Sequence, residues 1–282
     1  MNVEPPAHAS QVEPHAFVEL LGPALRQAAG VARTLEGRVA NQPKAADSAV
    51  KAALTLADSA AQETILVALS EHFPQVALRA EEETPSVASF PPEAPGRPLV
   101  VIDPIDGTLH SYLERRGPYA VMVGLARQGR YEAALVALPR EGLFFDAVRG
   151  GEARRQRPHG AARSIRARAE GEAVIVSHEM PEKVLERLEE RGFAPVPGCG
   201  GAISVAPLIP GVRGGLRLAR QGSISIRGRI GVMIARAAGA WALREGGKPF
   251  PDDLLTPTRV LAVAANAGDA RRMLEALQLD EL

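Results

Sequence analysis

The residues with the clearest chemical potential form one hexapeptide, Asp103–Thr108, with the sequence Asp-Pro-Ile-Asp-Gly-Thr. The apolar run Leu99–Ile102 precedes it and predicts a buried strand that delivers two carboxylates three residues apart. Hard oxygen ligands at a strand end suit Mg²⁺, which binds a few carboxylates together with water and phosphate oxygens. The hexapeptide therefore predicts a site for a divalent metal ion and phosphate.

The end of the hexapeptide favours the phosphate. Gly107 permits close approach of the backbone, and Thr108 opens a predicted short helix that runs to Tyr112. The N–H groups of Gly107, Thr108 and Leu109 would lie at the N-terminus of this helix, where free donors and the helix dipole favour an anion. The alternative is a capped turn in which Asp and Thr only satisfy backbone donors.

Other carboxylates of the first half could join this site. Glu81 and Glu82 follow a short predicted strand, and a neighbouring strand would bring a third carboxylate beside the two aspartates of the hexapeptide. Asp58 begins a predicted helix, which it could simply cap. Without the hexapeptide, an acidic run of this kind would indicate only a solvated cluster of charges.

Hydrophobic periodicity predicts the elements that position these residues. The strands 119–126 and 131–138 flank Arg127–Arg130 and predict a hairpin. The other expected helices are 15–35, 58–73, 181–191, 202–208, 232–244 (closed by Gly246) and one that begins at Asp269. The other expected strands are 76–79, 99–102, 143–148, 173–177, 216–219 and 260–265. The pattern indicates an antiparallel-rich sheet with helices, followed by a smaller α/β part.

The chain divides into a predicted flexible tail (1–14), an α+β half with the chemical motifs (15–155) and an α/β half (156–282). The N-terminus has no apolar signal-peptide core, and no run approaches the roughly 18 apolar residues of a membrane span. We therefore expect a soluble, cytoplasmic protein that does not contact a membrane.

Composition excludes several classes of protein. The 282 residues include 33 Lys and Arg against 33 Asp and Glu, a balance that argues against binding of a nucleic acid polymer. Cys199 is the single cysteine, which excludes an intramolecular disulfide and a cysteine-based zinc site. We expect Cys199 to be a small residue of a Gly-rich turn rather than a nucleophile.

Three segments occur in an order and at spacings that resemble a known family. Thr55–Asp58, Ala80–Glu82 and Ile102–Thr108 resemble the motif set of the inositol monophosphatase superfamily, which comprises magnesium-dependent, lithium-sensitive phosphatases of inositol phosphates, nucleotide bisphosphates and sugar phosphates. The resemblance covers roughly residues 15–282 and is specific up to residue 148. It implies a layered αβαβα sandwich of the inositol monophosphatase and fructose-1,6-bisphosphatase type, an α+β or α/β fold.

The same resemblance implies ligands for the metal. Glu81, Asp103, Asp106 and the carbonyl group of Ile105 would bind Mg²⁺, and Asp103 would bridge two ions. The implied partner is a small phosphorylated metabolite, whose identity stays open because the second half matches poorly. The resemblance also implies a homodimer.

Catalytic functions follow from the resemblance as well. Thr108, with Glu81 or Asp58, would orient the attacking water, and the amides of Gly107, Thr108 and Leu109 would hold the phosphate. The implied reaction is in-line hydrolysis of a phosphomonoester by metal-activated water. A phosphatase of the haloacid-dehalogenase type is disfavoured, because its two aspartates lie two residues apart rather than three.

One expected ligand is missing. The family places a further aspartate at the start of a late helix, where it binds the second metal. Counting back from Gly246 and Gly247 puts Ile234 at this position, a second alignment puts Ala235 there, and the stretch 191–244 contains no Asp or Glu. Two hypotheses remain: an active phosphomonoesterase with fewer protein ligands, or a catalytically impaired member that binds metal or a phosphorylated ligand.

Five other residues have weaker indications of function. His110 and Tyr112 could touch the substrate, although exposed positions on a short helix are the alternative. Arg115 and Arg116 could attract an anionic substrate, although a solvated basic turn is the favoured interpretation. Trp241 lies in an Ala-rich segment and is expected in the core or at an interface.

Overall fold

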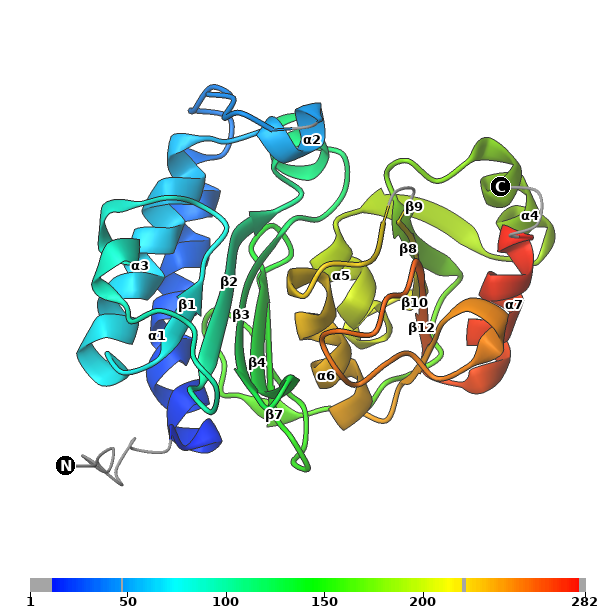
Figure 1. Cartoon of the computed structure of the whole chain (residues 1–282). Coiled ribbons are helices and arrows are strands. Elements are labelled where there is room, and N and C mark those ends of the chain that lie inside the picture. Colours follow the sequence, from blue (N-terminus) through cyan, green and yellow to red (C-terminus); the bar gives the residue numbers. More distant parts are fainter. Residues whose placement is uncertain (1–11, 47, 220–221, 279–282) are drawn as a thin grey trace.

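The computed structural model describes residues 12–46, 48–219 and 222–278, which form two sheets with helices on both sides of each (Figure 1). The helices are α1 (Pro14–Leu35), α2 (Ala49–Ala52), α3 (Leu56–His72), α4 (Glu182–Glu190), α5 (Gly200–Val205), α6 (Ile230–Ala237) and α7 (Ala267–Leu277). The strands are β1 (Ala77–Arg79), β2 (Leu99–Asp106), β3 (Ala120–Arg127), β4 (Arg130–Leu138), β5 (Leu143–Val148), β6 (Arg154–Gln156), β7 (Arg163–Ser164), β8 (Ala173–Ser177), β9 (Ala194–Gly198), β10 (Val212–Leu218), β11 (Trp241–Leu243) and β12 (Val260–Ala264).

The first sheet contains seven strands in sequence order, β1 to β7. Only β1 and β2 pair in parallel, and the other neighbours are antiparallel. The predicted hairpin of β3 and β4 is confirmed, with Gln128 (φ 47°) and Gly129 (φ 73°) at its turn. Positive φ at both turn residues matches the right-handed twist of the strands, which explains the tight connection.

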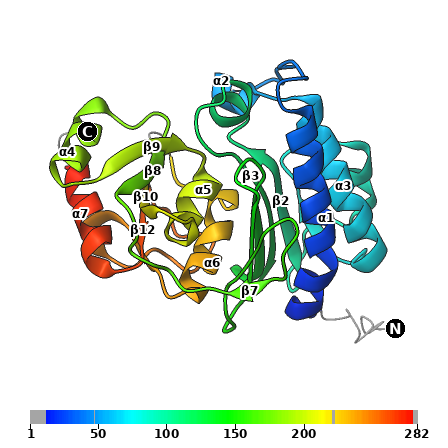
Figure 2. The ribbon, with the colours of Figure 1, turned by 180° about the vertical axis from the view of Figure 1, so that it is seen from behind.

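The second sheet has the order β11-β12-β10-β8-β9 and mixes parallel and antiparallel pairs. Helices α1 and α3 cover the outer face of the first sheet, α5 and α6 lie between the sheets, and α4 and α7 cover the far face of the second (Figures 1 and 2). This arrangement confirms the predicted layered αβαβα sandwich.

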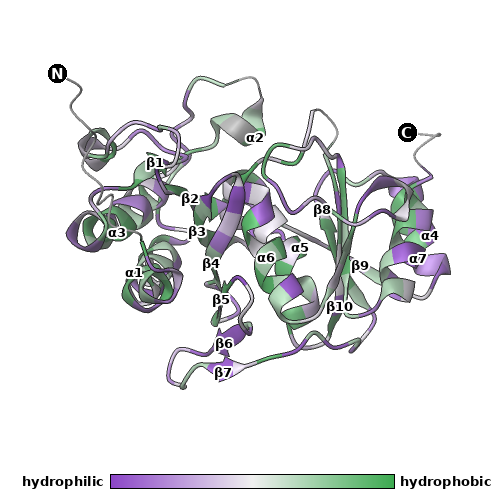
Figure 3. Cartoon of the chain, turned by 60° about the horizontal axis from the view of Figure 1, so that its bottom comes forward, coloured by the Kyte–Doolittle hydropathy of each residue, from purple (hydrophilic) through white to green (hydrophobic). Residues whose placement is uncertain are grey.

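The layers are held together by apolar side chains on facing surfaces. On α1, the fully buried Phe17, Leu21 and Leu25 face α3 and the first sheet, and Glu13 caps the helix by accepting from the Ala16 amide. Burial of each such large side chain contributes about 1.5–3 kcal/mol. Figure 3 shows the resulting contrast: the central strands and α6 are hydrophobic, whereas β6 and β7 are hydrophilic.

Several element boundaries differ from the sequence predictions. The second long helix begins at Leu56, because Thr55 caps it and Asp58 completes a capping box. The last helix is capped by Asn266 rather than Asp269. The segment between the first two predicted helices contains the short helix α2. The two helix starts shift by two residues each and leave the order of the long elements unchanged.

The predicted helix 232–244 is wrong in a way that matters for the site. Helix α6 ends at Ala237, Gly239 turns the chain with φ 81°, and β11 follows before Gly246 is reached. Helix α6 also begins at Ile230, two residues before the predicted start.

Two other expectations concern the ends and the surface of the chain. The predicted tail lies outside the described residues except for its last three positions. No described helix combines the length and the apolar character needed to cross a bilayer.

Candidate active site

The carboxylates of the first half meet where β1 and β2 end. The two strands pair in parallel with Arg79 opposite Val101, so Glu81 and Asp103 follow at the same sheet edge. Against β3, the register shifts by one residue between Asp103 and Asp106. This bulge matters because residues three apart in a regular strand point to opposite faces, and one extra residue brings both aspartates to the same side.

Burial and mutual repulsion make this carboxylate cluster electrostatically demanding. The Asp103 side chain is buried, and desolvation raises its pKa well above the usual range for an aspartate. The neighbouring carboxylates of Glu81 and Asp106 raise this pKa further. Such a cluster is stable in its charged form only with a positive charge close by.

Gly107 connects the strand to the helical turn Thr108–Leu113 and has φ 89°. A Cβ atom at this position would lie 2.7 Å from the Cβ of Cys199, so both the backbone angle and the contact require glycine. The buried Cys199 begins α5 in the second half and has a raised pKa because of desolvation. The predicted phosphate loop thus packs directly against the N-terminus of α5.

Asp58 and Thr108 form a buried hydroxyl–carboxylate pair. The Thr108 hydroxyl lies 3.0 Å from Asp58 Oδ1 and 2.8 Å from the carbonyl oxygen of Ile105. The amide and hydroxyl of Thr55 donate to Asp58 Oδ2 at 2.8 and 2.7 Å. Burial raises the pKa of Asp58 to about 6 in spite of these hydrogen bonds, which lower it. The structure therefore brings together the two residues that the sequence suggested for water orientation.

The positive charge that faces the cluster is the guanidinium group of Arg227. Its Nη2 lies 3.3 Å from Glu81 Oε1, and its Nε lies 3.5 Å from Asp103 Oδ2. Burial acts to lower the pKa of Arg227, but the charges of Glu81, Asp103 and Asp106 outweigh it and raise the pKa. The side chain is therefore a permanent cation within the carboxylate cluster.

The two positions that the sequence suggested for the missing aspartate lie in the core. Ile234 and Ala235 are fully buried in apolar clusters, so neither is the residue that faces the site. The turn Arg227–Arg229 leads directly into α6, and the resemblance places the ligand at the start of this helix. Arg227, at the entrance to α6, therefore faces the carboxylates from the second half.

The remaining carboxylates already have protein partners. The Gly201 amide donates to Asp106 Oδ2 at 2.5 Å, and Lys44 Nζ lies 2.5 Å from both oxygens of Glu82. In the described part of the chain, Asp103 Oδ1 is a buried oxygen without a hydrogen-bond partner. It is the cluster oxygen best placed to accept a cation.

The described residues do not fit the two-metal centre that the resemblance implies. Among them, no group of three or more His, Cys, Asp and Glu side chains is arranged to hold a metal ion. A guanidinium in contact with two of the expected ligands explains this result, because it occupies the space and neutralises the charge that would attract a second ion.

A second arginine of the second half lies nearby. Arg217 of β10 packs against Gly200 and Gly228. A Cβ atom added to Gly200 would lie 2.0 Å from Arg217 Nη1, and one added to Gly228 would lie 2.3 Å from it. Its Nη1 is buried and has no hydrogen-bond partner in the described residues. The sequence reasoning missed Arg217 and Arg227, although the absence of acidic residues between positions 191 and 244 was a usable signal.

The weaker candidates separate into different environments. The hydroxyl of Tyr112 donates to the Ala32 carbonyl oxygen, so it does not face a ligand. The Tyr112 side chain is buried, so the exposed position suggested as the alternative is also wrong. The ring of His110 stacks on that of His178 with 5.0 Å between centroids. Trp241 is 50% exposed, which excludes a core position and leaves the expected interface untested.

Comparisons with known proteins agree with this fold and with the order of the motifs. The sequence profile of the inositol monophosphatase family matches residues 18–202. No curated protein matches the sequence at a significant level.

Solved structures resemble nearly the whole chain. The Thermotoga maritima IMPase has a TM-score of 0.73 at 19% identity and covers 94% of this chain and 99% of its own. The extragenic suppressor protein SuhB of Bartonella henselae has a TM-score of 0.71 at 18% identity, over 93% of this chain and 98% of its own.

A third similar structure is an IMPase/NADP phosphatase complexed with Mg²⁺ and phosphate, with a TM-score of 0.68 at 18% identity, over 94% of this chain and 95% of its own. At these identities the likeness establishes the fold, and the profile match over most of the chain establishes the family. The chain therefore belongs to the inositol monophosphatase family, and this membership supports a phosphatase, that is, a phosphoric monoester hydrolase, of that family.

Proposed function

We propose that the site binds the phosphate group of a small phosphorylated metabolite and that magnesium-dependent turnover at this site is strongly impaired. Arg227 carries this proposal, since its guanidinium contacts Glu81 and Asp103 at 3.3 and 3.5 Å. It supplies locally the positive charge that Mg²⁺ supplies in the family. A guanidinium binds phosphate oxygens well, but it cannot lower the pKa of a bound water as a divalent ion does.

The second half supports an anionic ligand. Arg217 contacts Gly228, and the cation Arg227 precedes Gly228 in the sequence. Among the described residues, Arg217 Nη1 has no hydrogen-bond partner. The stretch 191–244 contains no Asp or Glu, so it contributes no carboxylate to the side of the site that these arginines form. A buried guanidinium nitrogen without a partner is unusual in native structures, and a ligand phosphate or carboxylate would satisfy it.

A second candidate is a phosphomonoesterase that retains turnover. The Thr108–Asp58 pair favours it, because a buried hydroxyl 3.0 Å from a carboxylate can position a water molecule. Asp58, with its pKa raised to about 6, could accept the proton that this water loses when it attacks phosphorus. The water would then form the new P–O bond while the alcohol departs and takes up a proton.

An assay of phosphate release separates the two candidates. The wild type and Arg227→Asp are compared with Mg²⁺ on an inositol monophosphate, a nucleotide 3′,5′-bisphosphate and a sugar phosphate. We expect negligible release by the wild type and a clear gain in the variant on at least one substrate. Wild-type release that exceeds that of the variant would overturn the impaired site and support the second candidate.

Binding is measured separately, so that a missing substrate is not mistaken for a missing site. Inorganic phosphate is titrated into the wild type and into Arg217→Ala by calorimetry, without metal. Heat of binding in the wild type that weakens in the variant supports the proposal. Equal binding in both proteins would show that Arg217 does not contribute to phosphate binding.

We also propose a homodimer, on the basis of the resemblance. The 50% exposure of Trp241 is compatible with a subunit interface, because Trp is enriched at such surfaces. Light scattering of the wild type and of Trp241→Glu tests this proposal. A monomeric wild type would contradict it.

A further inference from the structure

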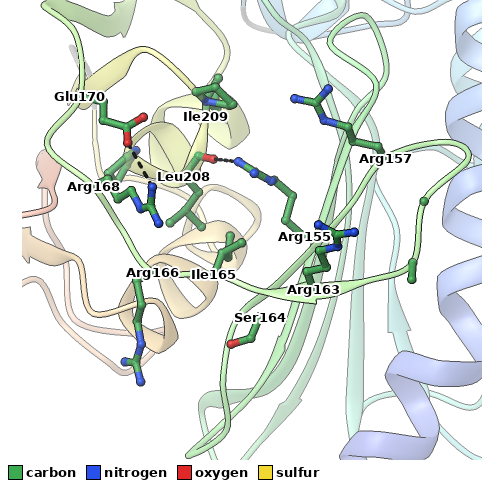
Figure 4. Close-up of a pocket in the computed structure, with 14 residues that line it drawn as sticks. Arg155, Arg157, Arg163, Ser164, Ile165, Arg166, Arg168, Glu170, Leu208 and Ile209 are labelled. Atoms are coloured by element: carbon green, nitrogen blue, oxygen red, sulfur yellow. Dashed lines mark hydrogen bonds and ion pairs between the residues drawn. The ribbon is translucent and has the colours of Figure 1, made fainter.

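A separate cavity of about 750 Å³ lies between the two halves of the molecule, away from the carboxylate cluster (Figure 4). One wall is the β6–β7 hairpin, with Arg155, Arg157 and Arg163. The opposite wall consists of the segment that leads to β8, including Arg168, and of the turn Pro207–Pro210. No residue that lines this cavity belongs to the Asp103–Thr108 site.

The lining is strongly basic, with five arginines and one glutamate. Arg168 pairs with that glutamate, Glu170, at 3.5 Å, and Arg166 lies 3.8 Å from Glu152 outside the cavity. Among the described residues, Arg155, Arg157 and Arg163 have no carboxylate within ion-pair distance. Like charges on one wall repel one another, and an anion between them would relieve this repulsion.

Neighbouring residues show that this lack of partners is local. Arg154, adjacent to Arg155 on β6, pairs with Glu19 at 2.8 Å and with Asp146 at 2.7 Å. Successive residues of a strand point to opposite faces, so one face of β6 is neutralised and the other presents its charge to the cavity. The hydrophilic colouring of β6 and β7 in Figure 3 reflects this composition.

One hydrogen bond across the cavity and two behind one of its walls hold it in shape. Arg155 Nη1 donates to the Leu208 carbonyl oxygen at 3.3 Å and so links the two walls. The amides of Ala167 and Arg168 donate to the carbonyl oxygens of Ala238 and Pro207 at 2.9 and 3.3 Å. The first bond positions the Arg155 guanidinium before a ligand arrives, and the backbone bonds fix the segment that carries Arg168, which lowers the entropic cost of binding.

We infer that this cavity binds a small polyanion that carries at least two phosphate groups. Guanidinium groups match phosphate oxygens with paired hydrogen bonds, and the cavity volume is in the range of small-ligand sites. Ile165, Leu208 and Ile209 add an apolar part to the lining, which suits a ligand with an apolar or aromatic group beside its phosphates. The chain as a whole has no excess of basic residues, which favours a small ligand over a nucleic acid polymer.

Calorimetric titration tests this inference, with ATP and inorganic tripolyphosphate as probes in metal-free buffer containing EDTA. The Arg157→Ala/Arg163→Ala variant removes two exposed side chains, so its fold should persist, and thermal unfolding without ligand checks this. The Arg79→Ala/Arg271→Ala variant is the matched control, because it removes the same number of positive charges elsewhere on the surface.

We expect both probes to bind the wild type and the control, and to bind the Arg157→Ala/Arg163→Ala variant at least about tenfold more weakly. The same loss should appear when Arg157→Ala/Arg163→Ala is introduced into Arg227→Ala, because Arg227 belongs to the other site and cannot account for it. Tighter binding of ATP than of tripolyphosphate would support a contribution of the apolar lining, and equal binding would support recognition through phosphates alone.

Three results would overturn the inference. The first is no binding of either probe to the wild type, and the second is equal affinity in the cavity variant and the control. The third is tighter binding of a single-stranded RNA oligonucleotide than of either small probe, which would indicate a polymer as the ligand. Loss of phosphatase activity is not a readout here, so failure of the proposed function leaves this test unaffected.

Discussion

The first half of the chain supplies acidic residues that the resemblance assigns to the site, whereas the second half supplies an arginine to the same cluster. Asp58, Glu81, Asp103 and Thr108 come together as the resemblance implies, with Thr108 3.0 Å from Asp58. From the second half, Arg227 reaches into the same cluster where an aspartate is expected. An intact motif on one side of a composite site therefore does not establish the chemistry of the whole site.

The largest expected effect comes from restoring the charge on the second-half side. Arg227→Asp should raise the rate of magnesium-dependent phosphate release by roughly 10²–10⁴-fold, because it removes the competing cation and adds a ligand. Initial rates at saturating Mg²⁺ measure this change. Binding of Mn²⁺, followed by electron paramagnetic resonance, should improve in the same variant. Unchanged rate and unchanged Mn²⁺ binding would show that Arg227 is not what limits the site.

The next effect tests the contact between the two halves. Gly107→Ala should destabilise the protein by about 2–5 kcal/mol, since it adds a Cβ atom at positive φ and in contact with Cys199. Urea unfolding followed by circular dichroism measures this loss. Gly129→Ala is the control, because Gly129 has φ 73° but no neighbouring atom within 4 Å of its added Cβ. A loss at Gly107 no larger than that at Gly129 would mean that the contact between the halves is not tight.

A smaller effect concerns the pH dependence of stability. The pKa of Asp58 is about 6 in the folded state, above the value of 3.8 for an unperturbed aspartate. The folded state therefore binds more protons between these two values, so the contribution of Asp58 to stability is present at low pH and is lost as pH rises through about 6.

Comparison with Asp58→Asn isolates this contribution. Between pH 4 and pH 7, the stability of the wild type relative to the variant should fall by roughly 1–3 kcal/mol. Urea unfolding of both proteins across this range measures the difference. A constant difference between the two proteins would show that Asp58 titrates normally.

The smallest effect provides the baseline for ion pairs outside the site. Arg79 pairs with Glu93 at 2.6 Å, and both side chains are 46% exposed. Arg79→Ala should therefore cost less than about 1 kcal/mol, because solvent screens an exposed pair. Arg227→Ala should cost more in the same unfolding assay, since it leaves the buried Asp103 without its cation. Equal costs would indicate that the Arg227 contacts are as solvated as a surface pair.

Most of the first half could be predicted from the sequence, because its signals are local. Short apolar runs identified β3, β4 and β5, and the residues between β3 and β4 identified their hairpin. The hexapeptide combined strand, turn and ligand types within six residues, so its chemistry and its position at a strand end could be read together.

The second half was less predictable, because its helices are short and its strands are joined by glycine-rich turns. Counting from Gly246 pointed to Ile234, which lies within α6 and is buried. Only the end of α6 at Ala237 and the intervening β11 show that Arg227 stands at the helix entrance. Spacing along the chain cannot reveal this, since a strand and a helix of equal length advance the chain by different distances.

The sequence by itself determined the family, the order of the layers and the carboxylates at the end of β2. The tertiary structure decided which residue of the second half meets them, because that meeting depends on the packing of α6 between two sheets. It also decided that arginines from β6, β7 and the following segment surround one cavity. Both features join residues far apart in the sequence, and only three-dimensional packing sets the distances between them.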